Sequence, residues 1–313
     1  MAELAYLQVA RVCNQQCLFC SNPENGRVIG WDEAVSLVDS FVAQGAAGVI
    51  FTGGEPTLFE RLPELVAYAR AKGLTPRMIT NGQRVARPGY LHALAAAGLE
   101  HIHVSIHSVK PRVQAHLTGN ARSLPNILKT VELAGDEGIR VDVNTVINAE
   151  NADHLSLNVR FLVGRFPFIR HFVWNNLDPL MNRASLNPAL VPKLRAFEVE
   201  LHKAMSFLDA AGITFRVERV PLCYMSEFPH RSTETRKLVK DEKGRIYFLD
   251  EKGMHHQSKS SWTYDKPECC AVCTLSPICA GLYQMGVYYS PDELCPRFDP
   301  LEAVVAAVRN DAP

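Results

Sequence analysis

Apolar residues along the first two thirds of the chain follow two alternating patterns. Short apolar runs, such as residues 6–13 (YLQVARVC), are separated by segments in which apolar residues recur every three or four positions, such as residues 31–44. The short runs predict buried strands, and the periodic segments predict helices that end at a following glycine. The predicted strands are residues 6–13, 47–52, 76–82 with its turn, 100–107, 139–147 and 169–175, and the predicted helices are residues 31–44, 62–72, 90–97, 124–137 and 154–166.

Six such strand–helix alternations with short connections predict the fold class. Neighbouring parallel strands need a long crossover between them, and a helix supplies it. We therefore expect an α/β protein whose parallel sheet curls into a partial (β/α)6 barrel of the TIM type. In such barrels chemistry gathers at the carboxyl ends of the strands, so the residues directly after each strand are the candidates for a site.

The pattern changes after the sixth predicted strand. Residues 191–212 predict one long helix, and the strict alternation of residues 213–220 predicts a half-buried strand. The polar residues 229–243 predict a solvated loop or lid, and residues 244–253 predict a hairpin with its turn at 250–253. The two expected domains are a barrel core, residues 1–212, and a C-terminal domain, residues 213–313.

Composition narrows the class of protein. Hydrophobic residues make up 47% of the 313 residues, and Lys+Arg 33 balance Asp+Glu 33. The sequence has neither the basic excess of a nucleic-acid-binding surface nor the run of about 20 apolar residues that spans a membrane, and no secretion signal is visible. We expect a soluble, cytoplasmic protein that binds neither nucleic acid nor membrane. In the reducing cytoplasm its nine cysteines favour metal binding over disulfides.

Three cysteines follow the first predicted strand. Cys13, Cys17 and Cys20 have the spacing C-x3-C-x2-C, and we call residues 13–20 the cysteine loop. Thiolates are the ligands that iron–sulfur clusters and zinc prefer. A cubane cluster normally takes four protein ligands, so three cysteines would leave one iron free to bind a substrate or cofactor. The alternatives are a zinc site or three unrelated core cysteines.

The turn Gly53-Gly54-Glu55-Pro56 follows the second predicted strand. Two glycines allow close backbone approach, and Glu55 adds a negative acceptor, although alone the motif also describes an ordinary turn. Together with the cysteine loop, in which Phe19 takes the aromatic position of C-x3-C-x-aromatic-C, it resembles the radical S-adenosylmethionine (radical SAM) enzymes.

This resemblance implies cofactors and a reaction. The cysteine loop would hold a [4Fe–4S] cluster whose free iron is chelated by S-adenosylmethionine, and the Gly-Gly-Glu-Pro turn would hold the methionine amino group. An electron from an external donor such as flavodoxin or ferredoxin would cleave S-adenosylmethionine to methionine and a 5′-deoxyadenosyl radical. That radical would abstract a hydrogen atom from the substrate.

Polar residues at other strand ends are further candidates for cofactor contact. The resemblance implies that Asn81, Ser105 and Asn144, after the third, fourth and fifth strands, help to bind S-adenosylmethionine. His103 and His107 share one face of the fourth predicted strand, and either could face the active site, while Asn175 closes the sixth. Each of these residues also fits an ordinary cap or turn.

A second group of cysteines lies near the C-terminus. Cys270, Cys273, Cys279 and Cys295 supply four thiolates, enough to close a cluster without a free iron. The run resembles the SPASM or twitch extension of radical SAM enzymes, with Tyr283 where a further cysteine of the full pattern would stand. The resemblance implies a small cysteine-rich extension with one auxiliary [4Fe–4S] cluster. A structural zinc site is the alternative.

Two cysteines remain outside these groups. Cys269 could exchange roles with Cys270. Cys223 has three interpretations: a ligand to the auxiliary cluster, a catalytic thiol that donates a hydrogen atom to the substrate radical, or a buried cysteine without chemistry. A thiol donor would imply epimerisation, whereas a cluster ligand would fit oxidation.

The resulting prediction is an enzyme that acts on a ribosomally made peptide or a small polar metabolite. Dehydrogenation, epimerisation and crosslinking all remain open. A peptide would be recognised by the barrel mouth, by the region between Pro221 and Trp262, or by a separate peptide-recognition protein. The rival functions are a non-catalytic iron–sulfur sensor or electron carrier, against which the Gly-Gly-Glu-Pro turn argues, and a zinc-stabilised interaction protein.

Overall fold

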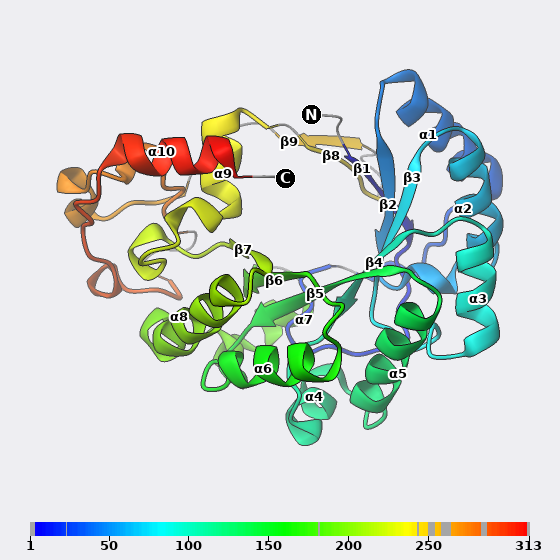
Figure 1. The fold of residues 1–313 in the computed structure, drawn as a ribbon, viewed down its shortest axis with the longest axis horizontal. Coiled ribbons are helices and arrows are strands. Elements are labelled where there is room, and N and C mark those ends of the chain that lie inside the picture. Colours follow the sequence, from blue (N-terminus) through cyan, green and yellow to red (C-terminus); the bar gives the residue numbers. More distant parts are fainter. Residues whose placement is uncertain are drawn as a thin grey trace.

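The described part of the protein forms a nine-stranded sheet that curves into a partial barrel, as the computed structural model shows (Figure 1). The strand order is β7-β6-β5-β4-β3-β2-β1-β8-β9, in which all neighbours run parallel except the antiparallel pair β8 and β9. The strands are β1 Leu4–Ala10, β2 Gly48–Gly53, β3 Thr75–Thr80, β4 His101–Ser105, β5 Arg140–Ile147, β6 His171–Asn176, β7 Thr214–Glu218, β8 Gly244–Tyr247 and β9 Met254–Gln257. The structure describes residues 4–22, 24–180, 182–242, 244–249, 254–257, 264–282 and 287–311.

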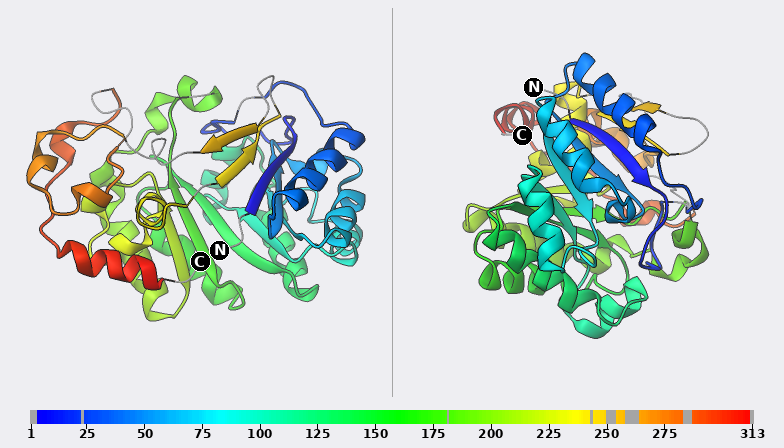
Figure 2. Two further views of the ribbon diagram at one scale, coloured as in Figure 1. Left: turned by 90° about the horizontal axis from the view of Figure 1, so that it is seen from above. Right: turned by 90° about the vertical axis from the view of Figure 1, so that its right-hand side faces the viewer.

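Helices cover the outer face of the curved sheet (Figures 1 and 2). This arrangement confirms the α/β partial barrel that the alternation of strands and helices predicts. The α-helices are α1 Trp31–Ala43, α2 Leu62–Ala71, α3 Pro88–Ala96, α4 Pro111–Thr118, α5 Ser123–Asp136, α6 Leu155–Arg165, α7 Asn182–Leu186, α8 Leu194–Ala210, α9 Thr233–Lys240 and α10 Leu301–Asn310.

The two faces of the strands differ in polarity. On β4, Ile102 and Val104 are fully buried in the core against the helices. Successive side chains of a strand point to opposite faces. His101, His103 and Ser105 therefore point to the inner side of the barrel, which makes that side polar.

The strand β8 lies beside β1, although the two are far apart in the sequence (Figure 2). It pairs with β9 as an antiparallel hairpin, which confirms the predicted hairpin, while its turn at residues 250–253 lies outside the described residues. The predicted strand at residues 213–220 is β7, which pairs with β6. Three strands after residue 212, namely β7, β8 and β9, thus belong to the sheet of the barrel core, and the division into domains stays a prediction.

The prediction of a solvated loop at residues 229–243 is wrong. This segment contains α9, whose first turn buries Glu234 and Thr235, and the Thr235 hydroxyl donates to the carbonyl of Ile278 at 2.9 Å. The hydroxyl of Ser232 caps the helix by accepting from Thr235 N–H. The sequence did not predict this helix, because the residues that the helix buries are polar and give no apolar pattern. The helices α4, α7 and α10 were also not predicted.

Among the described residues, no helix is both long and apolar enough to cross a membrane.

Candidate active site

The cysteine loop follows β1 and rests on α4. Gln16 N–H and Leu18 N–H donate to the carbonyls of Thr118 and Leu117 at 3.0 and 2.9 Å. These bonds resemble strand pairing and give the loop a defined path beside the helix. The loop is therefore held by backbone contacts that leave its cysteine side chains available.

The three thiols of the loop lie close enough to interact. All three are partly buried, and burial together with the Cys20 and Glu55 charges raises the pKa of Cys13 to about 11. Burial, followed by the charges of Cys20 and Cys13, also raises the pKa of Cys17. With pKa values raised in this way, Cys13 and Cys17 stay protonated at neutral pH and would lose their protons when a metal binds. Three clustered thiols on one short loop fit the three protein ligands of a [4Fe–4S] cluster.

The Gly-Gly-Glu-Pro turn is pressed against the start of the cysteine loop. Gly54 N–H donates to the carbonyl of Ala10 at 2.6 Å, and the next N–H donates to the carbonyl of Val12 at 2.9 Å. A Cβ atom on Gly53 would lie 2.0 Å from the Ala10 oxygen, and one on Gly54 would lie 2.2 Å from the Val12 oxygen. Only glycine allows this approach at either position.

The carboxylate of Glu55 points into the protein. It accepts hydrogen bonds from the N–H and hydroxyl of Thr57, the hydroxyl of Thr80 and the N–H of Asn81, at 3.2, 2.8, 2.8 and 2.8 Å. Glu55 is fully buried, and Pro56, also buried, begins the short 3-10 turn that follows. Because the chain itself occupies both oxygens, Glu55 positions the turn and the end of β3.

Asn81 connects β3 to the cysteine loop. Its side-chain amide donates to Asn14 Oδ1 at 2.7 Å and lies 3.6 Å from Cys13 Sγ. On the next strands, Asn175 donates to Asn144 Oδ1 at 2.6 Å, and Ser105 is the register partner of Asn144. The structure thus places Asn81 at the cysteines and the other three together on the inner face of β4–β6.

Phe19 and His107 pack together behind the loop. Their ring centroids are 4.4 Å apart in an edge-on arrangement, and both side chains are buried. Val146 N–H donates to Nδ1 of His107 at 3.2 Å. Burial lowers the pKa of His107 to about 3, so the ring is neutral and packs as an uncharged group against Phe19.

Two residues that the sequence analysis did not single out support the same region. Arg183 of α7 donates through Nε to the carbonyl of Cys17 at 2.9 Å. Asn22 donates to the carbonyl of Gly53 at 2.7 Å and so ties the segment after the loop to the end of β2. The sequence analysis could not find these two residues, because neither belongs to a local motif and each acts through a contact with a distant segment.

The C-terminal cysteines surround a small cavity. Residues that line it include Cys270, Cys273, Cys279 and Cys295, and Cys223 lies among them. Backbone N–H groups point at two of these sulfurs: that of Gly281 at Cys279 Sγ, 3.4 Å away, and that of Arg297 at Cys273 Sγ, 3.3 Å away. Hydrogen bonds to sulfur are a feature of iron–sulfur sites. The lining of the cavity includes the four thiols that the sequence analysis expects to bind a cluster.

The remaining two cysteines differ in their surroundings. Among the described residues Cys270, and not Cys269, lines the cavity, while the Cys269 thiol faces the carbonyl of Leu294 at 3.7 Å. Burial raises the pKa of Cys223 to about 12. The position of Cys223 favours the ligand interpretation over the hydrogen-donor interpretation. The candidate Tyr283 lies outside the described residues.

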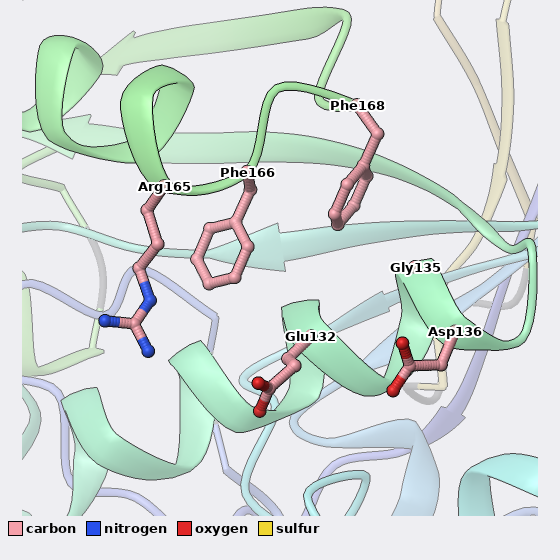
Figure 3. A pocket seen from close by; sticks show the side chains of 6 residues that line it. All are labelled: Glu132, Gly135, Asp136, Arg165, Phe166 and Phe168. Atoms are coloured by element: carbon pink, nitrogen blue, oxygen red, sulfur yellow. The ribbon is translucent and has the colours of Figure 1, made fainter.

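A more open pocket lies elsewhere, between α5 and the loop that follows α6 (Figure 3). Its walls belong to the outer helical layer, and no predicted site residue contributes to it. The pocket is lined by Glu132, Gly135, Asp136, Arg165, Phe166 and Phe168.

Comparison with known families identifies the barrel. A sequence profile described as the Radical SAM superfamily matches residues 7–162, which include the cysteine loop and the Gly-Gly-Glu-Pro turn. Through these residues the chain belongs to the radical SAM superfamily. This membership confirms the family and the enzyme class predicted from the two motifs, and it supports a [4Fe–4S] cluster and S-adenosylmethionine as cofactors.

Individual relatives extend the comparison. The chain is 33% identical over 196 residues to the PqqA peptide cyclase of Xanthomonas campestris pv. campestris (strain B100), an alignment that covers 58% of this chain and 50% of that protein. It therefore spans about half the length of this curated relative.

Solved structures agree on the radical SAM fold. Streptococcus suis SuiB bound to S-adenosylmethionine superposes with a TM-score of 0.63 at 14% identity, covering 90% of this chain and 73% of that one. Native anSMEcpe with bound AdoMet and Kp18Cys peptide gives a TM-score of 0.64 at 13% identity, covering 97% and 96%. At these identities the likeness concerns the fold alone.

Proposed function

We propose that this radical SAM protein modifies a peptide by hydrogen-atom abstraction. The observation that carries the proposal is the joint placement of the three loop thiols, the Gly-Gly-Glu-Pro turn and Asn81 at the carboxyl ends of β1–β3. When bound there, the [4Fe–4S] cluster and S-adenosylmethionine supply a 5′-deoxyadenosyl radical for that abstraction.

The chain's own residues have three tasks in this proposal. Cys13, Cys17 and Cys20 hold the cluster, and the backbone of the Gly-Gly-Glu-Pro turn binds the methionine group. Ser105 and Asn144 on the inner face bind the rest of the cofactor. The buried, packed rings of Phe19 and His107 help to exclude water from the reacting atoms.

A peptide is the proposed substrate class because of what similar proteins are described to do. The relative from Xanthomonas campestris is a peptide cyclase, and the anSMEcpe structure contains a bound peptide. An external donor such as flavodoxin or ferredoxin would provide the electron, and a separate peptide-recognition protein would present the substrate. A small polar metabolite is the alternative substrate.

The C-terminal cavity is the proposed site of one auxiliary [4Fe–4S] cluster. Four thiolates from Cys270, Cys273, Cys279 and Cys295 complete it, and the backbone N–H groups that point at two of these sulfurs support it. Cys223 adds a fifth thiol at the same cavity. One of the five is therefore free for another role.

The test is anaerobic cluster reconstitution with iron and sulfide counting, together with a dithionite-dependent assay for 5′-deoxyadenosine. We expect about eight irons in the intact protein and about four in the Cys13→Ala, Cys17→Ala, Cys20→Ala triple variant. Only the intact protein should form 5′-deoxyadenosine. Cluster binding without 5′-deoxyadenosine would instead indicate a sensor or electron carrier, and zinc without sulfide would indicate an interaction protein.

Further variants in the triple-variant background test the auxiliary site. Cys279→Ser should remove the remaining irons, whereas Cys269→Ser should keep them. In the intact background, loss of iron in Cys223→Ser would make Cys223 a ligand. Retained iron with loss of the peptide product alone would make it the hydrogen donor.

A further inference from the structure

Three metal-binding side chains that the proposed function does not use meet inside the barrel. His101 and His103 lie on the inner face of β4, and Asp142 of β5 is the register partner of His103. One ligand atom from each of the three lies within 4.8 Å of the others. We call these three residues the lumen cluster.

The distances in the lumen cluster match those between ligands of one ion. Asp142 Oδ2 lies 2.8 Å from His101 Nε2 and 3.6 Å from His103 Nδ1. Ligands bound to zinc at about 2.0–2.1 Å in a tetrahedron are about 3.3 Å from each other, a value that lies between the two distances. A small adjustment of the side chains would therefore create a coordination site.

The imidazole of His103 also has unused binding capacity. Within the described residues, its buried Nε2 atom has no hydrogen-bond partner, whereas Nε2 of His101 already faces Oδ2 of Asp142. The side chains of His101, His103 and Asp142 are 5%, 19% and 3% exposed. A buried polar atom without a partner is unfavourable, and a bound ion would supply one. Burial lowers the pKa of His103 to about 3, which keeps this ring neutral and able to ligate at physiological pH.

Two arginines lie near the lumen cluster, and their positive charges oppose the binding of a cation. Arg140 Nε lies 3.2 Å from Oδ1 of Asp142, so it occupies the oxygen that points away from the histidines and leaves Oδ2 facing them. The Arg140 side chain is 56% exposed, so water and salt screen its repulsion of a cation. Arg77 on β3 also interacts electrostatically with Asp142. Its positive charge makes the binding of a cation at the lumen cluster weaker than it would be without this arginine.

We propose that the lumen cluster binds one divalent first-row transition-metal ion, represented by Zn²⁺, through His101, His103 and Asp142. Two imidazoles and a carboxylate are a ligand set that zinc and its neighbours accept. The site is separate from the cysteine loop, because His101 begins β4 and Ser105 ends it, about 13 Å further along the strand. The proposal is independent of the proposed function.

The test uses cluster-loaded protein, in which seven of the nine cysteines are already cluster ligands. The protein is incubated with Zn²⁺, passed through a desalting column and analysed for zinc and iron. X-ray absorption at the zinc edge then identifies the ligands. We expect about one retained zinc per chain, with nitrogen and oxygen neighbours at about 2.0–2.1 Å. Sulfur neighbours at about 2.3 Å, or no retained zinc, would overturn the proposal.

Variants provide a second line of evidence. His103→Gln and Asp142→Asn should each weaken zinc binding by about tenfold or more, as expected for loss of one ligand. The exposed His92→Gln is the matched control and should retain zinc. Unchanged zinc in both ligand variants would contradict the proposal. If a ligand variant fails to keep its iron or its circular dichroism spectrum, the absorption spectrum of the unaltered protein decides the question.

Discussion

At the scale of single residues, Gly53 has the most demanding backbone of the candidate site. Its φ of +136° lies in a region that side chains rarely allow, and a Cβ atom would lie 2.0 Å from a backbone oxygen. That oxygen belongs to Ala10, the last residue of β1, so it cannot move without shifting the start of the cysteine loop. The position therefore links the Gly-Gly-Glu-Pro turn to the cysteines directly.

Gly53→Ala should abolish 5′-deoxyadenosine formation and lower the free energy of unfolding by about 3 kcal/mol, because the strand ends must separate. Gly89→Ala is the control, since nothing lies within 4 Å of a Cβ atom there. Urea unfolding and the deoxyadenosine assay measure the two effects. Normal activity in Gly53→Ala would show that the turn does not set the geometry of the loop.

His107 gives the site a defined response to acid. Its folded-state pKa of about 3 lies below the ordinary 6.5, so the folded protein binds this proton less readily than the unfolded chain. The stability contributed by the neutral ring is complete above pH 6.5 and is lost as the pH falls from 6.5 toward 3. The physical cause is burial, which disfavours the charged imidazolium.

Below pH 6.5, His107 should lower the free energy of unfolding by about 1.4 kcal/mol for each pH unit. His107→Gln should remove that part of the slope, as urea unfolding of cluster-free protein between pH 5 and pH 7 would show. The exposed His92→Gln should leave the slope unchanged. Equal slopes in His107→Gln and the unaltered protein would contradict the assignment.

At the scale of elements, the residue after α10 holds the C-terminal helix to the sheet. Asp311 pairs with Arg216 of β7, and its other oxygen lies 2.8 Å from Arg231. All three side chains are largely buried, so the charges are poorly solvated without each other. Lys240 of α9 adds a bond to the Asp311 carbonyl at 2.8 Å.

Asp311→Asn should lower the free energy of unfolding by about 3 kcal/mol, because it removes the buried carboxylate charge that Arg216 and Arg231 share. Asp209→Asn is the matched control: this half-exposed carboxylate lies 3.9 Å from Arg231 and should contribute about 0.5 kcal/mol or less. Thermal or urea unfolding distinguishes the two. Similar losses in both variants would mean that burial does not strengthen the Asp311 pairs.

Most elements with a regular apolar pattern could be predicted from the sequence, and those with a polar buried face could not. The helix α10 is an exception, because it buries Val304 and Val308 and yet was not predicted. The helix α1 was predicted as residues 31–44 and runs from Trp31 to Ala43. The helices α4 and α9 were not predicted, because the residues that they bury include the polar Gln114, Thr118, Glu234 and Thr235, which do not contribute to an apolar pattern. The motifs of the candidate site could be recognised in the sequence, because the residues of each motif lie close together along the chain.

At the scale of the whole molecule, β8 extends the parallel sheet past β1. Ile246 sits in the centre of this arrangement, paired with Tyr6 on one side and His255 on the other. A sequence pattern cannot reveal such pairing, because it depends on which strand edge remains free once the other strands have folded. The placement joins the N-terminal strand and the hairpin of β8 and β9 into one sheet.

Ile246→Pro should lower the free energy of unfolding by about 2–3 kcal/mol, because proline cannot donate to the ladder within a sheet. Ile246→Val keeps the backbone donor and should change it by about 1 kcal/mol at most. Circular dichroism during urea unfolding measures both. A proline variant as stable as the valine variant would show that β8 contributes little to the sheet.

The pairing of β8 with β1 also has a consequence for biosynthesis. Gln8 of β1 accepts from Leu249 N–H, and 241 positions separate the two residues in the chain. At about 5–20 residues per second, a ribosome needs roughly 10 to 50 seconds to make that length. During this interval the outer edge of β1 has no strand beside it, and an open edge can pair with other chains. The nascent protein is therefore most prone to association before β8 emerges.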